Sequence, residues 1–335
     1  MITASAPGKV VLSGEYAVLA GAPALVAAVN RRASCSAAAA AGATWRFTSS
    51  GFDGSARHSL EHLLAGELVH HDDPAYLCQH VLHALVRLGA DMSVLPHALA
   101  WRLDSAPFYH AGTKLGLGSS AAITVAFGCA LAALSRCTID VPAALFAAHA
   151  RSQGGHGSGL DVATSLHGGL MRFRRRDNGR DIATVELSRD VSFVFVSTGT
   201  PASTPSQLAQ FAAWTRGGVP APLAALCSAA ERVAAMVQDG VSFVRELRAY
   251  VSCLIALDTV AGLGIVTPPH RALLHLAQLT GVVYKPCGAG GGDLGMAFTD
   301  RPGGLAAFIT RAHHAGFAPL PLELDQDGVQ VSHQT

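Results

Sequence analysis

Residues 112–122 read Gly-Thr-Lys-Leu-Gly-Leu-Gly-Ser-Ser-Ala-Ala, and an apolar run from Ala121 to Leu134 follows directly. A glycine-rich turn ahead of good helix formers exposes backbone N–H groups at a helix N-terminus, which carries partial positive charge. Such an end suits a phosphate, because glycines permit close backbone approach and the serine hydroxyls can cap the helix or reach a metal ion. Taken alone, the stretch is equally consistent with a capped turn that binds nothing.

Two other phosphate-binding motifs compete for this stretch. A Walker A loop is excluded because Lys114 precedes the glycines instead of following them. Gly116-x-Gly118-x-x-Ala121 fits the dinucleotide fingerprint, and Asp140 stands at about the right distance beyond it. No β-branched strand leads into Gly116, so a Rossmann oxidoreductase is a weak alternative.

Composition limits the class of protein. With 335 residues the chain is long enough for two domains, and 24 basic against 23 acidic residues leave no electrostatic footprint for nucleic acid. The apolar run 121–134 is too short for a bilayer span, so we expect no membrane partner. The start lacks a signal-peptide pattern and the seven cysteines form no Cys-x-x-Cys pair, which predicts a cytoplasmic location.

Hydrophobic periodicity predicts an alternation of helices and strands. Val10–Leu12 and Tyr16–Leu19 predict a hairpin-like start, and Asp73-Pro74 predicts the beginning of a helix. We expect further helices at 142–152, 204–214, 220–238, 241–260, 268–279 and 303–315, and strands at 24–29, 191–197, 294–298 and 329–331. A composition shift at 178–190 predicts a division into an N-terminal domain, 1–180, and a C-terminal domain, 181–335.

Two more unusual loops stand beside the first. Residues 154–161 place four glycines ahead of Asp161, and residues 288–293 read Gly-Ala-Gly-Gly-Gly-Asp. Taken in isolation, Asp161 is best interpreted as a helix N-cap. Lys9, which follows Pro7-Gly8, is in isolation best interpreted as a surface lysine at a strand edge. Three glycine-rich loops together exceed what turn chemistry requires in one globular chain.

Three segments of the chain resemble the motifs of the GHMP small-molecule kinases. They are 6–9 with 13–19 (Ala-Pro-Gly-Lys and Ser-Gly-Glu-Tyr-Ala-Val-Leu), 116–122 and 288–293, and their order and spacing agree over nearly the whole chain. Within this family the chain is most similar to the phosphomevalonate kinases. The residues that carry this similarity are Lys114 and the segments 153–163, 201–204 and 285–293. It departs from the mevalonate kinases where they carry an upstream glutamate: here the helix offers His149, Ala150 and Arg151, which leaves a second magnesium ligand open.

The resemblance implies an α+β, two-domain GHMP kinase fold with an N-terminal half like ribosomal-protein S5 domain 2 and a ferredoxin-like C-terminal half. It implies ATP and Mg²⁺ as cofactors, with Asp161 orienting or deprotonating the attacking oxygen and Lys9 stabilising the transferring phosphoryl group. The implied nucleotide-binding residues are Lys114, Gly116, Leu117, Gly118, Ser119, Ser120 and Ala121, with Ser119 or Ser120 as the magnesium ligand. The implied substrate-binding residues are Glu15, Tyr16, Gly157, Ser158, Ser203, Gly290, Gly291 and Asp293. The acceptor phosphate would need cations beyond Lys9; Lys114 and Arg172 are weaker candidates for them, and Lys114 could instead serve the ATP phosphates.

The activity implied by the resemblance is transfer of a phosphoryl group from ATP to phosphomevalonate, giving diphosphomevalonate. A kinase for mevalonate or another small alcohol and an ATP-dependent decarboxylase are alternatives that use the same machinery. A non-catalytic nucleotide-binding protein is disfavoured, because it would not need both Lys9 and Asp161. We expect a small anionic substrate and a monomer or homodimer.

Overall fold

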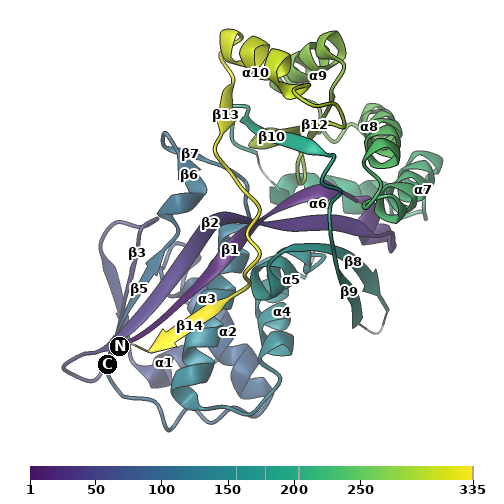
Figure 1. Cartoon of the computed structure of the whole chain (residues 1–335). Coiled ribbons are helices and arrows are strands. Elements are labelled where there is room, and N and C mark those ends of the chain that lie inside the picture. The colour runs from purple at the N-terminus through teal and green to yellow at the C-terminus, as the bar shows by residue number, and fades with distance from the viewer. Residues whose placement is uncertain (156, 178, 203, 334–335) are drawn as a thin grey trace.

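The computed structural model describes residues 1–155, 157–177, 179–202 and 204–333. It consists of a large sheet with helices against one face and a smaller sheet with its own helices, shown at the top and right of Figure 1. Ser203, predicted to bind substrate, lies outside the described residues. Among the described residues, no helix is both long and apolar enough to cross a membrane.

The large sheet has eight strands. They are β1 (Ile2–Ser13), β2 (Ala24–Ala39), β3 (Trp45–Ser49), β4 (Ser55–His58), β5 (Leu99–Asp104), β8 (Leu170–Arg176), β9 (Gly179–Val185) and β14 (Gln330–His333). The order is β14-β1-β2-β5-β3-β4, with β8 on the first part of β2 and β9 on β8. Every pairing is antiparallel except β3 with β5. Residue 180 therefore lies within a hairpin, and the end of the chain returns to the first strand.

Five helices belong to the N-terminal half: α1 (Leu60–Leu64), α2 (Tyr76–Arg87), α3 (Ser119–Ser135), α4 (Val141–Ser152) and α5 (Leu160–His167). Helix α3 packs on β1 and β2 with one side and on α2 and α4 with the other, which explains why it is apolar almost all round. At Gly128 a Cβ would lie 2.1 Å from the Leu145 side chain, so this glycine sets the close approach of α3 and α4. The helix that begins at the phosphate-loop candidate is thus held in the core.

The C-terminal half contains the second sheet, formed by β10 (Ser192–Ser197), β11 (Val283–Pro286), β12 (Leu294–Thr299) and β13 (Ala318–Leu320). Its order is β11-β12-β10-β13 and it is antiparallel throughout, which is the ferredoxin-like arrangement. Its helices are α6 (Thr204–Trp214), α7 (Ala221–Ala235), α8 (Gly240–Ala261), α9 (Pro268–Thr280) and α10 (Leu305–His314). One continuous hydrophobic core spans both halves, and the predicted α+β architecture is confirmed.

Two sequence-based expectations are wrong. The predicted strand Tyr16–Leu19 is not a strand, because Ala17–Ala20 is a 3₁₀ turn, η1, and the antiparallel partner of β1 is β2 instead. Strand β1 also runs unbroken through Pro7, with a register shift beside Gly8. The Rossmann alternative also fails. The segment before Gly116 is β7 (Thr113–Lys114), which pairs only with β6 (Tyr109–His110), and Asp140 caps α4 through the Ala143 N–H.

A buried ion pair joins the two halves. The Lys285 ammonium on β11 donates to the Glu15 carboxylate after β1 and, at 3.0 Å, to the Val11 carbonyl oxygen. The Tyr250 hydroxyl on α8 donates to the other Glu15 oxygen at 2.7 Å. Burial alone would lower the pKa of Lys285, but its neighbours Cys287 and Glu15 outweigh burial and raise that pKa. Both charges are satisfied inside the protein.

Lys285→Met should lower the free energy of unfolding by about 3–5 kcal/mol, because it leaves the Glu15 carboxylate buried without its partner. Urea denaturation at pH 7 measures the loss. Glu15→Gln in the same chain should recover part of it, and Arg174→Met, which breaks a more exposed pair with Glu231, should cost below about 1 kcal/mol. An effect of Lys285→Met no larger than that of Arg174→Met would contradict the assignment.

Candidate active site

Two cavities meet between the halves of the protein, and both are lined by Lys9, Asp161, Gln153 and Leu208. The larger has a volume of about 420 Å³; its other lining residues are Lys114, Gly116, Gly118, Ser119, Ser120, Ser152, Ala202, Ala209 and Asp293. The smaller has about 110 Å³; its other lining residues are Val11, Glu15, Tyr16, Val18, Leu19, Gly157, Ser158, Leu160, Gly288 and Ala289. The two predicted catalytic side chains therefore stand where the cavities join.

The phosphate-loop candidate forms the N-terminus of α3. Gly118 is the N-cap, with a φ of 78° that favours glycine, and the Ala122 N–H donates to its carbonyl at 3.1 Å. That bond is the first of the helix, so its N-terminal amides 119–121 have no intrahelical partner. Ser119 and Ser120 line the larger cavity, whereas the Leu117 side chain is buried in the core. This end of the helix can receive an anion through backbone N–H groups.

Lys9 is attached to the same loop. Its backbone N–H donates to the Leu117 carbonyl at 2.8 Å, and its ammonium donates to the Gly116 carbonyl at 3.3 Å. A Cβ built on Gly118 would lie 3.2 Å from the Lys9 side chain and 3.7 Å from the Cβ of Asp161. The missing side chain at 118 therefore lets the lysine and the carboxylate approach the loop together.

Asp161 is the second residue of α5, whose N-cap is Gly159 with a φ of 85°. The N-cap explanation of Asp161 is therefore wrong. One of its carboxylate oxygens accepts from the Val162 N–H at 3.2 Å and lies 3.9 Å from the ring of His149. The side chain stays 19% exposed, which leaves it accessible from both cavities.

The third glycine loop reaches the phosphate loop through Asp293. Its carboxylate accepts from the Ala202 N–H at 3.1 Å, and a Cβ on Gly116 would lie 2.2 Å from its other oxygen. Burial raises the pKa of Asp293, opposed first by the hydrogen bond from the Ala202 N–H and then by Lys9 and Lys114. Gly290 and Gly291 line neither cavity; their missing side chains make room for Ile265 and Gln207.

The smaller cavity receives four of the residues predicted to bind substrate: Glu15, Tyr16, Gly157 and Ser158. The Tyr16 hydroxyl donates to the Ala289 carbonyl at 2.6 Å, while the Glu15 carboxylate is already engaged by Lys285. Arg172 is exposed on β8 and lines neither cavity. Among the described residues that line this cavity, Lys9 is the one lysine or arginine.

Sequence reasoning missed several residues of this site. Gln153 lines both cavities, and Leu208 and Ala209 of α6 close the larger one from the C-terminal half. Lys285 belongs to a segment that carries the resemblance, but its pairing with Glu15 was not predicted, because the two residues are distant in sequence. In the sequence, His149 is noticeable only because it lies on the helix where the mevalonate kinases carry a glutamate.

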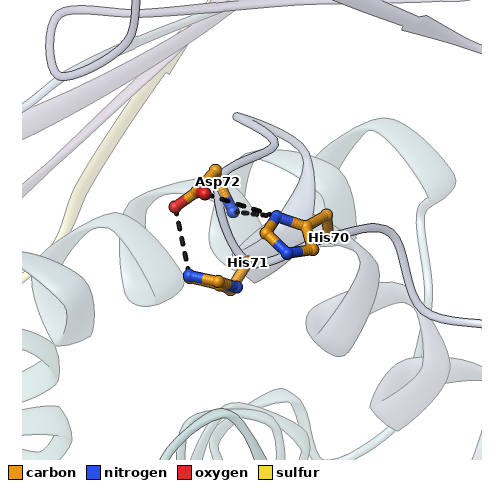
Figure 2. A group of neighbouring side chains, drawn as sticks. All are labelled: His70, His71 and Asp72. Atoms are coloured by element: carbon orange, nitrogen blue, oxygen red, sulfur yellow. Dashed lines mark hydrogen bonds and ion pairs between the residues drawn. The ribbon is translucent and has the colours of Figure 1, made fainter.

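A separate group of side chains has the donor set of a metal site. His70 and His71 face the carboxylate of Asp72 from two sides, at 3.4 Å and 3.2 Å (Figure 2). All three are exposed in the connection between α1 and α2, and none lines the cavities described above. The group is therefore not part of the candidate active site.

Comparison with known proteins shows the family to which the chain is similar. Residues 103–169 match the model of the GHMP kinases N terminal domain. Phosphomevalonate kinase of Streptomyces sp. (strain CL190) is 30% identical over 370 residues, covering 98% of each chain, and mevalonate kinase of Aeropyrum pernix is 32% identical over about half of each chain. Phosphomevalonate kinase of Streptococcus pneumoniae, solved with phosphomevalonate and AMPPNP, superposes with a TM-score of 0.80 over 97% of this chain and 100% of that one, at 22% identity.

The chain belongs to the GHMP kinase family. Within the family it is similar to the phosphomevalonate kinases along nearly its full length.

One buried histidine supports the third glycine loop from behind. His270 on α9 donates from Nε2 to the Gly292 carbonyl at 3.1 Å, so Nδ1 accepts from the Tyr284 hydroxyl at 2.9 Å. Burial is the main cause that lowers the pKa of His270, to about 4. The ring is therefore neutral at pH 7, and protonation would cost it the acceptor role at Nδ1.

Stability should therefore depend on pH through His270. The unfolded state binds this proton near pH 6.5 and the folded state only near pH 4, so the contribution is complete above pH 6.5 and is lost as the pH falls toward 4, by about 3 kcal/mol. Urea unfolding measured at several pH values should show a shallower dependence in His270→Gln than in the wild type. His275→Gln, on the exposed face of the same helix, should keep the wild-type slope; equal slopes in the two variants would refute the role.

Proposed function

We propose that this kinase transfers a phosphoryl group from ATP to the phosphate of phosphomevalonate, giving diphosphomevalonate. The observation that carries the proposal is the junction of two cavities at Lys9 and Asp161. One cavity ends at the N-terminus of α3, which suits a triphosphate, and the other offers a small second compartment for an acceptor. The similarity to the Streptomyces phosphomevalonate kinase over 98% of the chain supports this substrate.

The residues on the larger cavity suit the charge of a phosphoryl donor. Phosphoryl transfer is accelerated mainly by positioning and by neutralising charge. The N–H groups at residues 119–121 bind phosphate oxygens, and Lys9 and Lys114 supply positive charge on the cavity wall. Because Lys114 lines this cavity and not the smaller one, we assign it to the nucleotide.

The donor set also fits a magnesium ion. Mg²⁺ prefers oxygen ligands, and the Ser119 and Ser120 hydroxyls and the Asp161 carboxylate line one cavity. These residues would hold it, and it would neutralise phosphate charge in the nucleotide. Asp161 itself orients the attacking oxygen of the acceptor and takes its proton where it carries one. Lys9 stabilises negative charge at the junction.

A second candidate is mevalonate as the acceptor. It is favoured by one observation: Lys9 is the one lysine or arginine among the described residues lining the smaller cavity. Phosphomevalonate needs no cation other than Lys9 in the smaller cavity if its phosphate lies at the junction of the two cavities. The phosphoryl group from ATP must reach the acceptor phosphate at that junction. The two substrates differ in where they place charge, and direct competition separates them.

Asp161→Asn should lower kcat by at least about a hundredfold, because the amide cannot accept a proton or hold the acceptor as a carboxylate does. Its unfolding transition should stay near that of the wild type, since the side chain accepts a local hydrogen bond from the Val162 N–H and lies as far as 3.9 Å from His149 Nδ1. Asp140→Asn is the matched control: it lies at a helix N-cap, where asparagine serves as well, and should leave turnover intact. Wild-type turnover in Asp161→Asn would remove this residue from the mechanism.

With ATP saturating, the enzyme should turn over phosphomevalonate faster than mevalonate, measured as ADP release and by identification of the product. Lys114→Met should raise the apparent KM for ATP about ten- to a hundredfold and change that for the acceptor little, because loss of one charge-assisted contact costs about 1.5–3 kcal/mol. Faster turnover of mevalonate would leave the fold and mechanism standing and overturn the substrate. A raised acceptor KM in Lys114→Met would move this lysine to the acceptor side.

A further inference from the structure

A buried histidine connects the two functional groups of the larger cavity from behind. His149 on α4 is 2% exposed and lines neither cavity. Its Nε2 lies 3.2 Å from the Ser120 hydroxyl and 3.3 Å from the Gln153 amide nitrogen. Its Nδ1 lies 3.9 Å from the Asp161 carboxylate. One ring therefore faces both the hydroxyl and the carboxylate to which we assign roles in the reaction.

The contacts of the ring determine where its proton lies. The Gln153 amide nitrogen can only donate, so Nε2 must accept and the ring proton of the neutral imidazole is on Nδ1, directed toward Asp161. The amide oxygen of Gln153 is turned the other way, against Gly157, where an added Cβ would lie 2.6 Å from it. Gly157 therefore allows this orientation of the amide.

The same tautomer orients Ser120. Because Nε2 has no proton, the Ser120 hydroxyl can interact with it only by donating, and it shares the single Nε2 lone pair with the Gln153 N–H. Its oxygen lone pairs are then free for a ligand in the larger cavity, as binding of a cation requires.

We propose that His149 is a positioning residue of the phosphoryl transfer, acting through Ser120 on the magnesium–nucleotide and through Asp161 on the acceptor. The proposal rests on the proposed kinase function of the cavity. Each ring nitrogen then has a separate role, since Nε2 sets the hydroxyl and Nδ1–H sets the carboxylate. A histidine that served only to fill the core would have no reason to affect the two steps differently.

Two substitutions separate these roles. The amide of asparagine takes the place of Nδ1, and the amide of glutamine takes the place of Nε2. His149→Asn keeps a donor for Asp161 and loses the partner of Ser120, so it should weaken magnesium-dependent binding of AMPPNP about tenfold and lower kcat less. His149→Gln keeps the partner of Ser120 and should lower kcat about tenfold while weakening that binding less.

Calorimetric titration with AMPPNP, in Mg²⁺ and in EDTA, measures binding without turnover, and steady-state kinetics at saturating Mg²⁺ gives kcat. Ser120→Ala provides a second, independent measurement: in that background His149→Asn should cause no further loss of magnesium-dependent binding. His80→Asn and His80→Gln are matched controls, because His80 is also buried on a helix, α2, outside both cavities. The two His80 variants should shift the unfolding midpoint and leave both AMPPNP binding and kcat unchanged.

The proposal is supported if His149→Asn mainly weakens magnesium-dependent AMPPNP binding while His149→Gln mainly lowers kcat. It also requires that His149→Asn cause no further loss of binding in the Ser120→Ala background. The proposal is overturned if both variants keep the wild-type AMPPNP affinity and kcat, or if both lose the two quantities equally. It is also overturned if His149→Asn weakens AMPPNP binding as much in Ser120→Ala as in the wild type. None of these outcomes affects the kinase function. A wild-type protein that binds no AMPPNP in the presence of Mg²⁺ would instead overturn the proposed function, and this inference with it.

Discussion

The ion pair between Lys285 and Glu15 is the constraint on which the geometry of the site depends. It is buried on both sides and joins the strand that enters the third glycine loop to the turn that follows the first strand. Tyr250 holds the second carboxylate oxygen and also accepts from the Gly14 N–H, so a helix of the C-terminal half fixes the same turn. Because breaking such a pair leaves an uncompensated buried charge, the two halves are held in one relative position.

Once the halves are fixed, the glycines, which have no side chain, determine how closely the glycine-rich loops approach one another and Lys9. A Cβ on Gly116 would overlap the Asp293 carboxylate, and one on Gly118 would press on Lys9. Gly292 has the same role at the back of the third loop, where a Cβ would lie 2.4 Å from the Thr200 carbonyl oxygen. Each of these glycines, like Gly290 against Ile265, therefore allows one part of the protein to approach another more closely than a side chain would permit.

Local chemistry carried most of the sequence-based prediction. Periodicity and caps predicted α4 and the helices from α6 to α10, because these segments combine apolar periodicity with turn residues between them. The junction at Lys9 and Asp161 was predicted only through the family resemblance, because the two residues are far apart in the sequence. What the sequence could not show was non-local. Examples are the unbroken β1 through Pro7, the return of β14 to β1, and the partner of Glu15 on a strand of the other half.

The balance of charge at the site shows why a nearly neutral protein can bind polyanions. Two lysines and two carboxylates line the larger cavity, so the formal side-chain charges nearly cancel, as they do over the whole chain. The backbone adds to the attraction of the two lysines for phosphate: the N-terminus of α3 lies at the cavity and contributes partial positive charge that does not titrate. Carboxylates can be tolerated on the same wall because burial raises the pKa of Asp293, which weakens its ionisation, while Asp161 stays partly exposed for the chemistry. In the proposed function, the site therefore attracts its anionic ligands through the N-terminus of a helix together with Lys114, and it keeps Lys9 and Asp161 for the reacting atoms.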